Sequence, residues 1–363
     1  EVGNIDLSKS LGMFWSTERD TLSYRIRLNF NKKKRNRYVG PDTTLETLKK
    51  DFPSPMTKRL ALKLNHSIFD PQNILQPLLL KHRLAYREIL IHEKQTEDSG
   101  WDKPLDDKFR NQWLKITEEM FKLETLEFPR SLVPRNYDDK VKPTLCLFSD
   151  GSDLGQCVVA YLIWKMKDGS SHVSLVTSRT KIASMTKIST PKSELCAAQL
   201  SSRLRCWLVQ ELDIQVGKVF HFVDASILIG MLKNISLKFD TYTAPRITEI
   251  QMNTTVEEWF WLDTKENSSD LGTRGQCSVS DLGPGTMWRE GPAWLKDPPE
   301  SWPIRSDFKK HEVTNVKKEF EILPPTVTNL TQLVQLHNSI DLKTIDEEEV
   351  KINAVNTDED VDI

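Results

Sequence analysis

The sequence predicts a mixed α/β fold, in which a five-stranded sheet with flanking helices follows a mainly helical segment. Three observations predict it. Apolar residues recur at helical spacing over much of residues 41–130, and the period changes to two after Lys142. The elements that follow have the order βββαβααβ. We therefore divide the chain into residues 1–142, 143–275, 276–340 and 341–363.

Residues 1–142 are expected to begin with a β-hairpin and to continue as helices. Apolar and polar residues alternate on either side of a turn at 16–20, which is typical of a hairpin. Prolines punctuate the stretch that follows. We expect helices at 45–50, 56–69, 74–93 and 106–123. In the last, the spacing places Phe109, Trp113, Ile116 and Phe121 near one face.

Residues 143–275 are expected to form the sheet. Three β-rich runs joined by tight connections, at 144–149, 157–166 and 172–178, predict an antiparallel meander. The remaining expected elements are a helix at 192–212, a strand at 219–223, helices at 225–232 and 245–253, a strand at 257–262 and a helical turn after Asn267.

The end of the chain has a different composition. Residues 276–340 begin with many Pro, Gly and Trp, so we expect an ordered loop or a linker. Residues 341–363 hold nine acidic residues and two lysines, which predicts a disordered or weakly helical tail. The chain starts at Glu1 rather than Met and opens in mid-pattern, so we expect a piece of a longer protein. Five cysteines without a CxxC pair indicate buried thiols in a reducing compartment.

Charge is unevenly distributed along the chain. Residues 1–142 have 27 basic minus 21 acidic residues, +6; residues 143–275 have 14 minus 14, zero; residues 276–363 have 9 minus 17, −8. The basic run Lys32, Lys33, Lys34, Arg35 and Arg37 would suit a nucleic-acid backbone, although for the run taken alone a solvated loop is the favoured explanation. No run approaches the roughly 18 apolar residues that span a bilayer, which argues against a membrane protein.

Four acidic residues occupy positions that the strand order makes special. Asp150 ends the first strand and Asp224 the fourth, Glu194 lies in the first turn of the long helix, and Asp270 follows the fifth strand. Each alone could be a turn or capping residue. Together at one edge of a sheet they would repel one another unless divalent cations neutralised them. Oxygen ligands select Mg²⁺ or Mn²⁺, so the pattern indicates metal-assisted phosphodiester hydrolysis.

Each of these acids lies in a distinctive local sequence. The four are Phe148-Ser149-Asp150-Gly151-Ser152, Thr190-Pro191-Lys192-Ser193-Glu194-Leu195-Cys196-Ala197-Ala198, Val223-Asp224-Ala225-Ser226 and Asn267-Ser268-Ser269-Asp270-Leu271-Gly272-Thr273-Arg274-Gly275. They resemble Phe-Ser-Asp-Ala-Ser, Ile-Pro-Arg-Leu-Glu-Leu-x-Ala-Ala, Ser-Asp-Ser and Asn-Pro-Ala-Asp-Leu-x-Ser-Arg-Gly of the BEL/Pao-type LTR retrotransposon polyprotein, where reverse transcriptase joins ribonuclease H. Gly151 replaces the usual Ala, and no departure removes a carboxylate.

The resemblance extends to both sides. Residues 11–15 resemble the Leu-Gly-x-x-Trp that follows the polymerase palm, and residues 67–71 the Ser-x-Phe-Asp-Pro of the thumb and connection region. Residues 288–295 are similar to a stretch that leads toward integrase. The resemblance thus covers roughly residues 1–305. It implies a thumb/connection region over 1–142, an RNase H-like domain over 143–275 and a linker toward integrase over 276–340.

This family implies a ribonuclease H that cleaves the RNA strand of an RNA/DNA hybrid with two Mg²⁺ ions, for which Mn²⁺ can substitute. Asp150 would bridge the ions, Asp270 would help hold the ion that activates water, and Glu194 with Asp224 would hold the ion near the leaving oxygen. The implied partners are the upstream polymerase palm and the downstream integrase, in a cytoplasmic retroelement particle or the nucleus. A catalytically silent nucleic-acid-binding remnant and a scaffold within the polyprotein remain alternatives.

Other signals are weaker. Tyr137-Asp138-Asp139-Lys140 lacks the spacing and flanking strands of a polymerase Tyr-x-Asp-Asp. Asp98-Ser99-Gly100 has charged flanks, whereas an aspartic peptidase dyad needs apolar strands. The histidines form no HxH or HExxH array, so the sequence gives no support for zinc.

Overall fold

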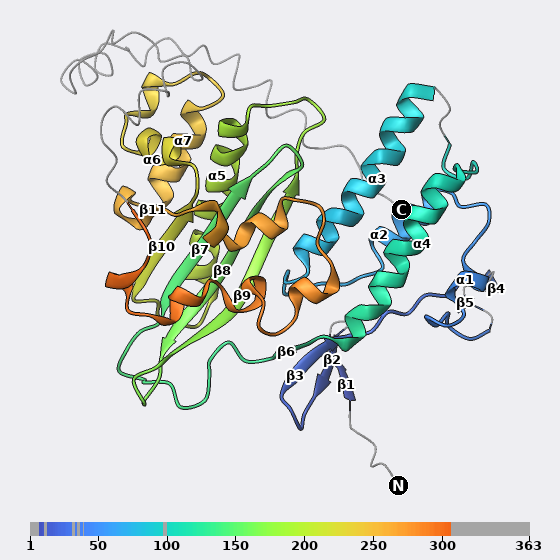
Figure 1. Ribbon diagram of the computed structural model, residues 1–363, viewed down its shortest axis with the longest axis horizontal. Coiled ribbons are helices and arrows are strands. Elements are labelled where there is room, and N and C mark those ends of the chain that lie inside the picture. Colours follow the sequence, from blue (N-terminus) through green and yellow to red (C-terminus); the bar gives the residue numbers. More distant parts are fainter. Residues whose placement is uncertain are drawn as a thin grey trace, which may run out of the picture. The chain divides into compact units, whose positions relative to one another are not determined.

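The computed structural model describes residues 7–10, 13–30, 33–34, 37–38, 40–96 and 100–305 (Figure 1). All of these residues belong to one compact unit. The expected acidic tail at 341–363 lies outside the described residues. No helix in the described part of the chain is long and apolar enough to cross a membrane.

A five-stranded mixed sheet has the strand order β11-β10-β7-β8-β9. The strands are β7 (Thr144–Gly151), β8 (Gly155–Lys165), β9 (Ser171–Ile182), β10 (Lys218–Val223) and β11 (Trp259–Trp261). The antiparallel meander β7-β8-β9 is confirmed, and β10 pairs in parallel with both β7 and β11. Since the carboxyl ends of parallel strands meet at one edge, the chain segments that follow β7, β10 and β11 lie near one another.

Helices cover one face of this sheet. α5 (Thr190–Glu211) packs Leu204 and Leu208 against Leu145, Val158 and other buried residues of that face. α7 (Ala244–Asn253) lies beside α5, and α6 (Ser226–Leu232) contacts both helices. The predicted helices of residues 143–275 are therefore confirmed, with ends that differ by a few residues.

Residues 276–305 cover the other face (Figure 1, orange). Their described elements are three 3₁₀ turns and the short helix α8 (Met287–Glu290). Trp288 is 1% exposed, and its carbonyl accepts a hydrogen bond of 2.7 Å from the Tyr161 hydroxyl of β8. The rings of Trp294 and Trp302 pack on Phe222 of β10. An ordered loop or a linker was expected for residues 276–340. Residues 276–305, the part that the structure describes, form an ordered segment that contributes to the core.

The helices of the first segment are α1 (Leu48–Asp51), α2 (Lys58–Asn65), α3 (Gln76–Thr96) and α4 (Asp107–Phe121). Phe109, Trp113, Ile116 and Phe121 of α4 are all buried, as predicted. The predicted hairpin pairs β2 (Met13–Ser16) with β3 (Thr21–Tyr24), and β1 (Leu7–Ser10) pairs with β2. β6 (Glu127–Pro129) adds an unpredicted strand next to β3, and β4 (Lys33–Lys34) pairs with β5 (Arg37–Tyr38).

Asp70 joins the hairpin to the start of α3. Its carboxylate accepts hydrogen bonds from the Tyr24 hydroxyl at 2.9 Å and from the backbone N–H groups of Ile74 and Leu75 at 3.1 and 2.9 Å. Burial raises the pKa of Asp70. Asn73 has a positive φ of 56°, and its carbonyl accepts a bond of 3.1 Å from the Ser178 N–H of β9. This loop thus satisfies part of the outer edge of the sheet.

α3 lies against β9 and the residue that follows it. The Arg83 guanidinium donates to Thr180 Oγ1 at 2.9 Å and to Gln76 Oε1 at 3.1 Å. Arg87 donates to the Ala183 carbonyl at 3.0 Å. Buried residues of α3, α4, β7 and β8 belong to one apolar cluster, so a single core runs through the helical segment and one face of the sheet.

The buried imidazole of His82 on α3 predicts acid sensitivity. Neither ring nitrogen has a hydrogen-bond partner among the described residues, and burial lowers the pKa of His82 from 6.5 to about 3. Because the unfolded chain binds this proton first, the stability is complete above pH 6.5 and is lost as the pH falls toward 3. From pH 7 to pH 5, the free energy of unfolding should fall by about 2 kcal/mol less in His82→Leu than in the parent chain, measured by urea unfolding.

The matched control is His66→Leu, which removes the same side chain from an exposed position. Equal losses in the parent and His82→Leu chains would show that His82 is not a source of the acid sensitivity.

Candidate active site

The carboxyl edge of the sheet brings acidic side chains together. Asp150, the penultimate residue of β7, is 6% exposed, and one of its carboxylate oxygens accepts a hydrogen bond from the Thr273 hydroxyl. Asp224 directly follows β10, beside β7 in the sheet. The Asp224 carbonyl accepts a bond of 2.8 Å from the Trp261 indole of β11, and its buried Oδ1 has no hydrogen-bond partner among the described residues. Parallel pairing therefore places these two acids side by side.

Glu194 reaches the same place from the start of α5, where it is the fifth residue of the helix rather than part of the first turn as expected. Its Oε2 accepts a hydrogen bond of 3.1 Å from the Gly151 N–H. The Ser193 hydroxyl donates to the Ser152 carbonyl at 2.8 Å and accepts from Gln156 of β8 at 3.0 Å. These bonds fasten the start of α5 to the end of β7.

Gly151 is required by this close approach. A Cβ atom there would lie 2.4 Å from the Ser193 carbonyl carbon and 2.5 Å from the Glu194 nitrogen, which are backbone atoms that cannot move aside alone. Gly151 stands where the family that the sequence resembles has Ala, and it is a point where β7 and α5 are in very close contact.

Three of the four predicted acids converge. Asp150, Glu194 and Asp224 each offer a carboxylate oxygen, and these atoms all lie within 4.8 Å of one another. Burial is the largest cause of the raised pKa of each, and the neighbouring carboxylates add to it. The pKa rises to about 6 for Asp150 and about 10 for Glu194. Such a cluster cannot hold three negative charges without a cation, which is the environment that hard divalent ions occupy.

Asp270 lies near this cluster but outside the group of three. It belongs to the 3₁₀ turn η5 (Ser268–Gly272), and its carboxylate binds the Arg274 guanidinium, with Nε at 2.8 Å. Its charge still contributes to the raised pKa of the other three acids. The Asn267 side-chain amide donates to the Ser149 carbonyl of β7 at 3.1 Å and so holds η5 against the sheet.

Three residues around the acids had no role in the sequence-based prediction. They are Asn267, Thr273 and Arg274, which position η5, bind Asp150 and pair with Asp270 respectively. All three lie in the segment 267–275, whose resemblance to the family could have pointed to them. The sequence-based prediction took only Asp270 from this segment.

The basic run of the first segment remains a prediction. Lys32 and Arg35 lie outside the described residues. Lys33, Lys34 and Arg37 belong to β4 and β5, of which only the backbone is described.

Comparison with known proteins agrees with this topology. Residues 57–225 match the family model of the Pao retrotransposon-like RNaseH-like domain. Together with the five-stranded mixed sheet and its flanking helices, this match gives the fold as RNase H-like. The matched range also includes α2, α3 and α4. No curated protein matches the chain.

Among solved structures, the chain is similar to the N-terminal RNase H domain of Rv2228c from Mycobacterium tuberculosis, solved as a fusion with maltose-binding protein. The identity is 9% and the TM-score 0.25, over 36% of this chain and 89% of that one.

The contact at Gly151 yields a test of the site geometry. Gly151→Ala should push β7 and α5 apart, destabilise the chain by about 1 to 3 kcal/mol in urea unfolding, and weaken the bond to Glu194. A crystal structure of the variant should show the first turn of α5 displaced from Gly151. An unchanged structure with unchanged stability would contradict the account of this contact.

Proposed function

We propose that this chain is a metal-dependent nuclease that hydrolyses the RNA strand of RNA/DNA hybrids as part of a BEL/Pao-type retrotransposon polyprotein. The observation that supports this most directly is the convergence of three buried carboxylates, from three separate elements of an RNase H-like sheet, within 4.8 Å. The family match to a Pao retrotransposon-like domain favours the same reaction class.

The residues fit divalent ions. The donor set consists of hard carboxylate oxygens, and the buried Oδ1 of Asp224 lacks a hydrogen-bond partner among the described residues. We assign Asp150 to two Mg²⁺ ions, Glu194 and Asp224 to the ion near the leaving oxygen, and Asp270 to the ion near the water; Mn²⁺ can substitute. Bound ions would lower the pKa of the attacking water and neutralise the charge that develops on the leaving oxygen.

The chain's own contacts prepare this arrangement. The Gly151 N–H holds one oxygen of Glu194, and the Thr273 hydroxyl holds one oxygen of Asp150, so each carboxylate has a fixed orientation. Arg274 pairs with Asp270 and lowers the pKa of Asp150 and Asp224. We assign Arg274 the role of holding Asp270 at the edge of the cluster.

The substrate and the wider assembly follow from the same proposal. An RNase H-like nuclease acts on nucleic acid, and a hybrid is distinguished by its shape and by the 2′-hydroxyls of one strand rather than by base edges. Within a polyprotein, the polymerase palm and integrase would be the neighbours, and the particle would lie in the cytoplasm or enter the nucleus.

Metal binding can be tested without catalysis. In EDTA, Asp150→Asn should be about 1 kcal/mol more stable than the parent chain, because one of three mutually repelling buried carboxylates becomes neutral. Saturating Mg²⁺ should stabilise the parent by about 1 to 3 kcal/mol and the variant much less, measured by urea unfolding.

Asp153→Asn is the matched control, since it neutralises an exposed acid three residues further on. The metal assignment fails if Asp150→Asn gains as much stability from Mg²⁺ as the parent does.

Catalysis is tested with a labelled RNA/DNA hybrid. The parent chain should cut the RNA strand in Mg²⁺ or Mn²⁺, and Asp150→Asn and Asp224→Asn should each lower the rate by at least about 10³-fold. Asp153→Asn should cut normally. If the parent chain is well folded and binds the hybrid without cutting it, the nuclease proposal is wrong and the catalytically silent nucleic-acid-binding remnant takes its place.

A further inference from the structure

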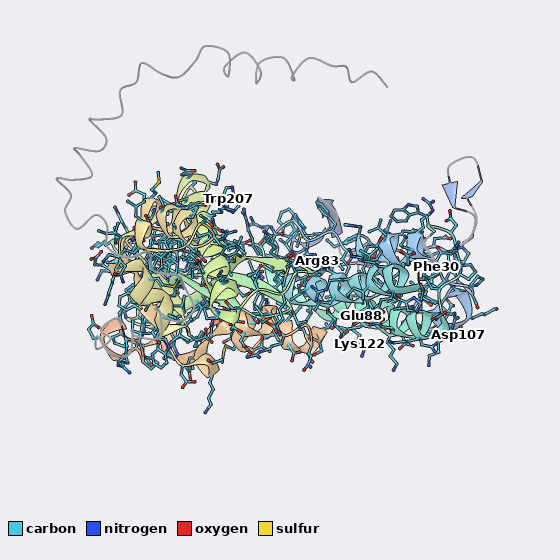
Figure 2. The ribbon with its side chains drawn as sticks, turned by 90° about the horizontal axis from the view of Figure 1, so that it is seen from above. Phe30, Arg83, Glu88, Asp107, Lys122 and Trp207 are labelled. Carbon is cyan, nitrogen blue, oxygen red and sulfur yellow. The ribbon has the colours of Figure 1, made fainter. Side chains whose placement is uncertain are left out.

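A groove of about 770 Å³ runs between α3 and α4 and reaches the turns beside the acidic cluster. Ala85 and Ile116, both buried, are among its apolar lining residues. The Leu154 turn and residues 274–276 close the end nearest the cluster. Figure 2 labels Glu88 of α3 and Asp107 of α4, which locate the two helices in a second view. We call this the α3/α4 groove.

The charge around the α3/α4 groove is predominantly positive. Its basic residues are Lys81, Arg87, Lys108, Lys115 and Arg274, against the two acids Glu88 and Glu119. Lys81 pairs with Glu119, and Arg274 with Asp270. Arg87, Lys108 and Lys115 have no ion-pair partner among the described residues. Glu88 has no ion-pair partner among these residues either and accepts a hydrogen bond from Gln112. The unpaired side chains therefore leave an excess of two positive charges beside a groove that is open to solvent.

The spacing of the two lysines suits an extended polyanion. Lys108 and Lys115 are exposed, lie seven residues apart on α4 and therefore project from one face about 10 Å from each other. A nucleic-acid strand advances about 3.4 Å per nucleotide, so the two lysines can contact different phosphates of one strand.

The α3/α4 groove is continuous with the candidate active site. Arg274 lines the groove while it pairs with Asp270, and its charge acts on Asp150 and Asp224. α3 contacts η5 directly, and a side chain at Gly275 would meet Leu84 of α3 at 2.6 Å. Two turns that follow predicted metal ligands, at Leu154 and Arg274, thus border the same groove.

We propose that the α3/α4 groove binds the phosphate backbone of the nucleic acid whose scissile bond lies at the carboxylate cluster. This inference rests on the proposed nuclease function and assigns part of its substrate-binding surface to the helical segment. Arg87, Lys108 and Lys115 neutralise phosphates there, and Arg274 marks the boundary between the binding groove and the reacting centre.

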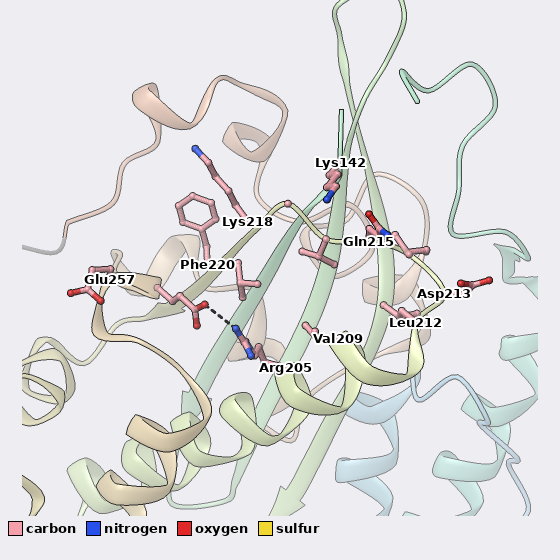
Figure 3. Close-up of a pocket in the computed structure, with 14 residues that line it drawn as sticks. Lys142, Arg205, Val209, Leu212, Asp213, Gln215, Lys218, Phe220 and Glu257 are labelled. Atoms are coloured by element: carbon pink, nitrogen blue, oxygen red, sulfur yellow. Dashed lines mark hydrogen bonds and ion pairs between the residues drawn. The ribbon is translucent and has the colours of Figure 1, made fainter. Parts of the chain in front are cut away.

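A second groove of about 850 Å³ serves as a comparison (Figure 3). It lies at the opposite end of β7 and β10, where Lys142 precedes β7 and Lys218 begins β10. Arg205 is paired there with Glu258 at 3.0 Å, and Asp213 and Glu257 add negative charge. Its charges balance and no candidate catalytic residue lines it, so it offers a matched site for control substitutions.

The test measures affinity for a short labelled RNA/DNA hybrid at several salt concentrations. All chains carry Asp150→Asn, and the buffer contains EDTA, so that binding is measured without cleavage. The double variant Lys108→Glu/Lys115→Glu should weaken binding by at least about tenfold and reduce the slope of log affinity against log salt by about 2. Lys108→Gln/Lys115→Gln should change both in the same direction by less.

The control is Lys142→Glu/Lys218→Glu, with the same change in net charge at the second groove. Far-UV circular dichroism and urea unfolding confirm that each variant is folded. The inference is wrong if hybrid affinity falls equally in the two charge-reversed chains, or in neither, as it would if the groove instead held an acidic protein. Groove-dependent binding by a parent chain that cuts nothing would refute the nuclease alone.

Discussion

The close approach of the end of β7 to the first turn of α5 is the constraint on which the rest of the site depends. Gly151 permits it, since any side chain there would collide with the backbone of Ser193 and Glu194. The approach brings Asp150 and Glu194 together, and parallel pairing of β10 with β7 adds Asp224. The fold thereby concentrates buried carboxylates that destabilise the ion-free protein, as sites built for divalent cations do.

The surrounding layers keep this arrangement in place. Asn267 ties η5 to β7, and α3 packs beneath the turn at Gly275, so a helix far away in sequence supports the segment that carries Asp270. Residues 276–305 bury Trp288 and Trp302 against the sheet or the segments beside it, and Trp294 packs there half-buried. Asp70 and Asn73 fasten the start of α3 to the hairpin and to β9. The helical segment is therefore part of the structure around the site as well as a neighbour of it.

Much of the fold could be predicted because its periodicity is local. The meander, α5 and the face of α4 that holds Trp113 follow from spacing alone, and the four acids stood out because strand order predicts which ends meet. The rest depends on tertiary contacts. β6 is three residues long and becomes a strand only beside β3. Trp288 lies in a segment rich in prolines and glycines that has no helix or strand periodicity, so its burial could not be predicted. Lys108, Lys115 and Arg274 share a groove only because α3 packs on α4.

The central claim is that Asp150, Glu194 and Asp224 form a divalent-cation site. Anomalous diffraction from crystals of the full chain soaked in Mn²⁺ tests it most directly, because manganese is located independently of the atomic coordinates. We expect anomalous peaks in contact with the carboxylates of all three residues. A fully ordered cluster without a manganese peak at high Mn²⁺ concentration would contradict the account.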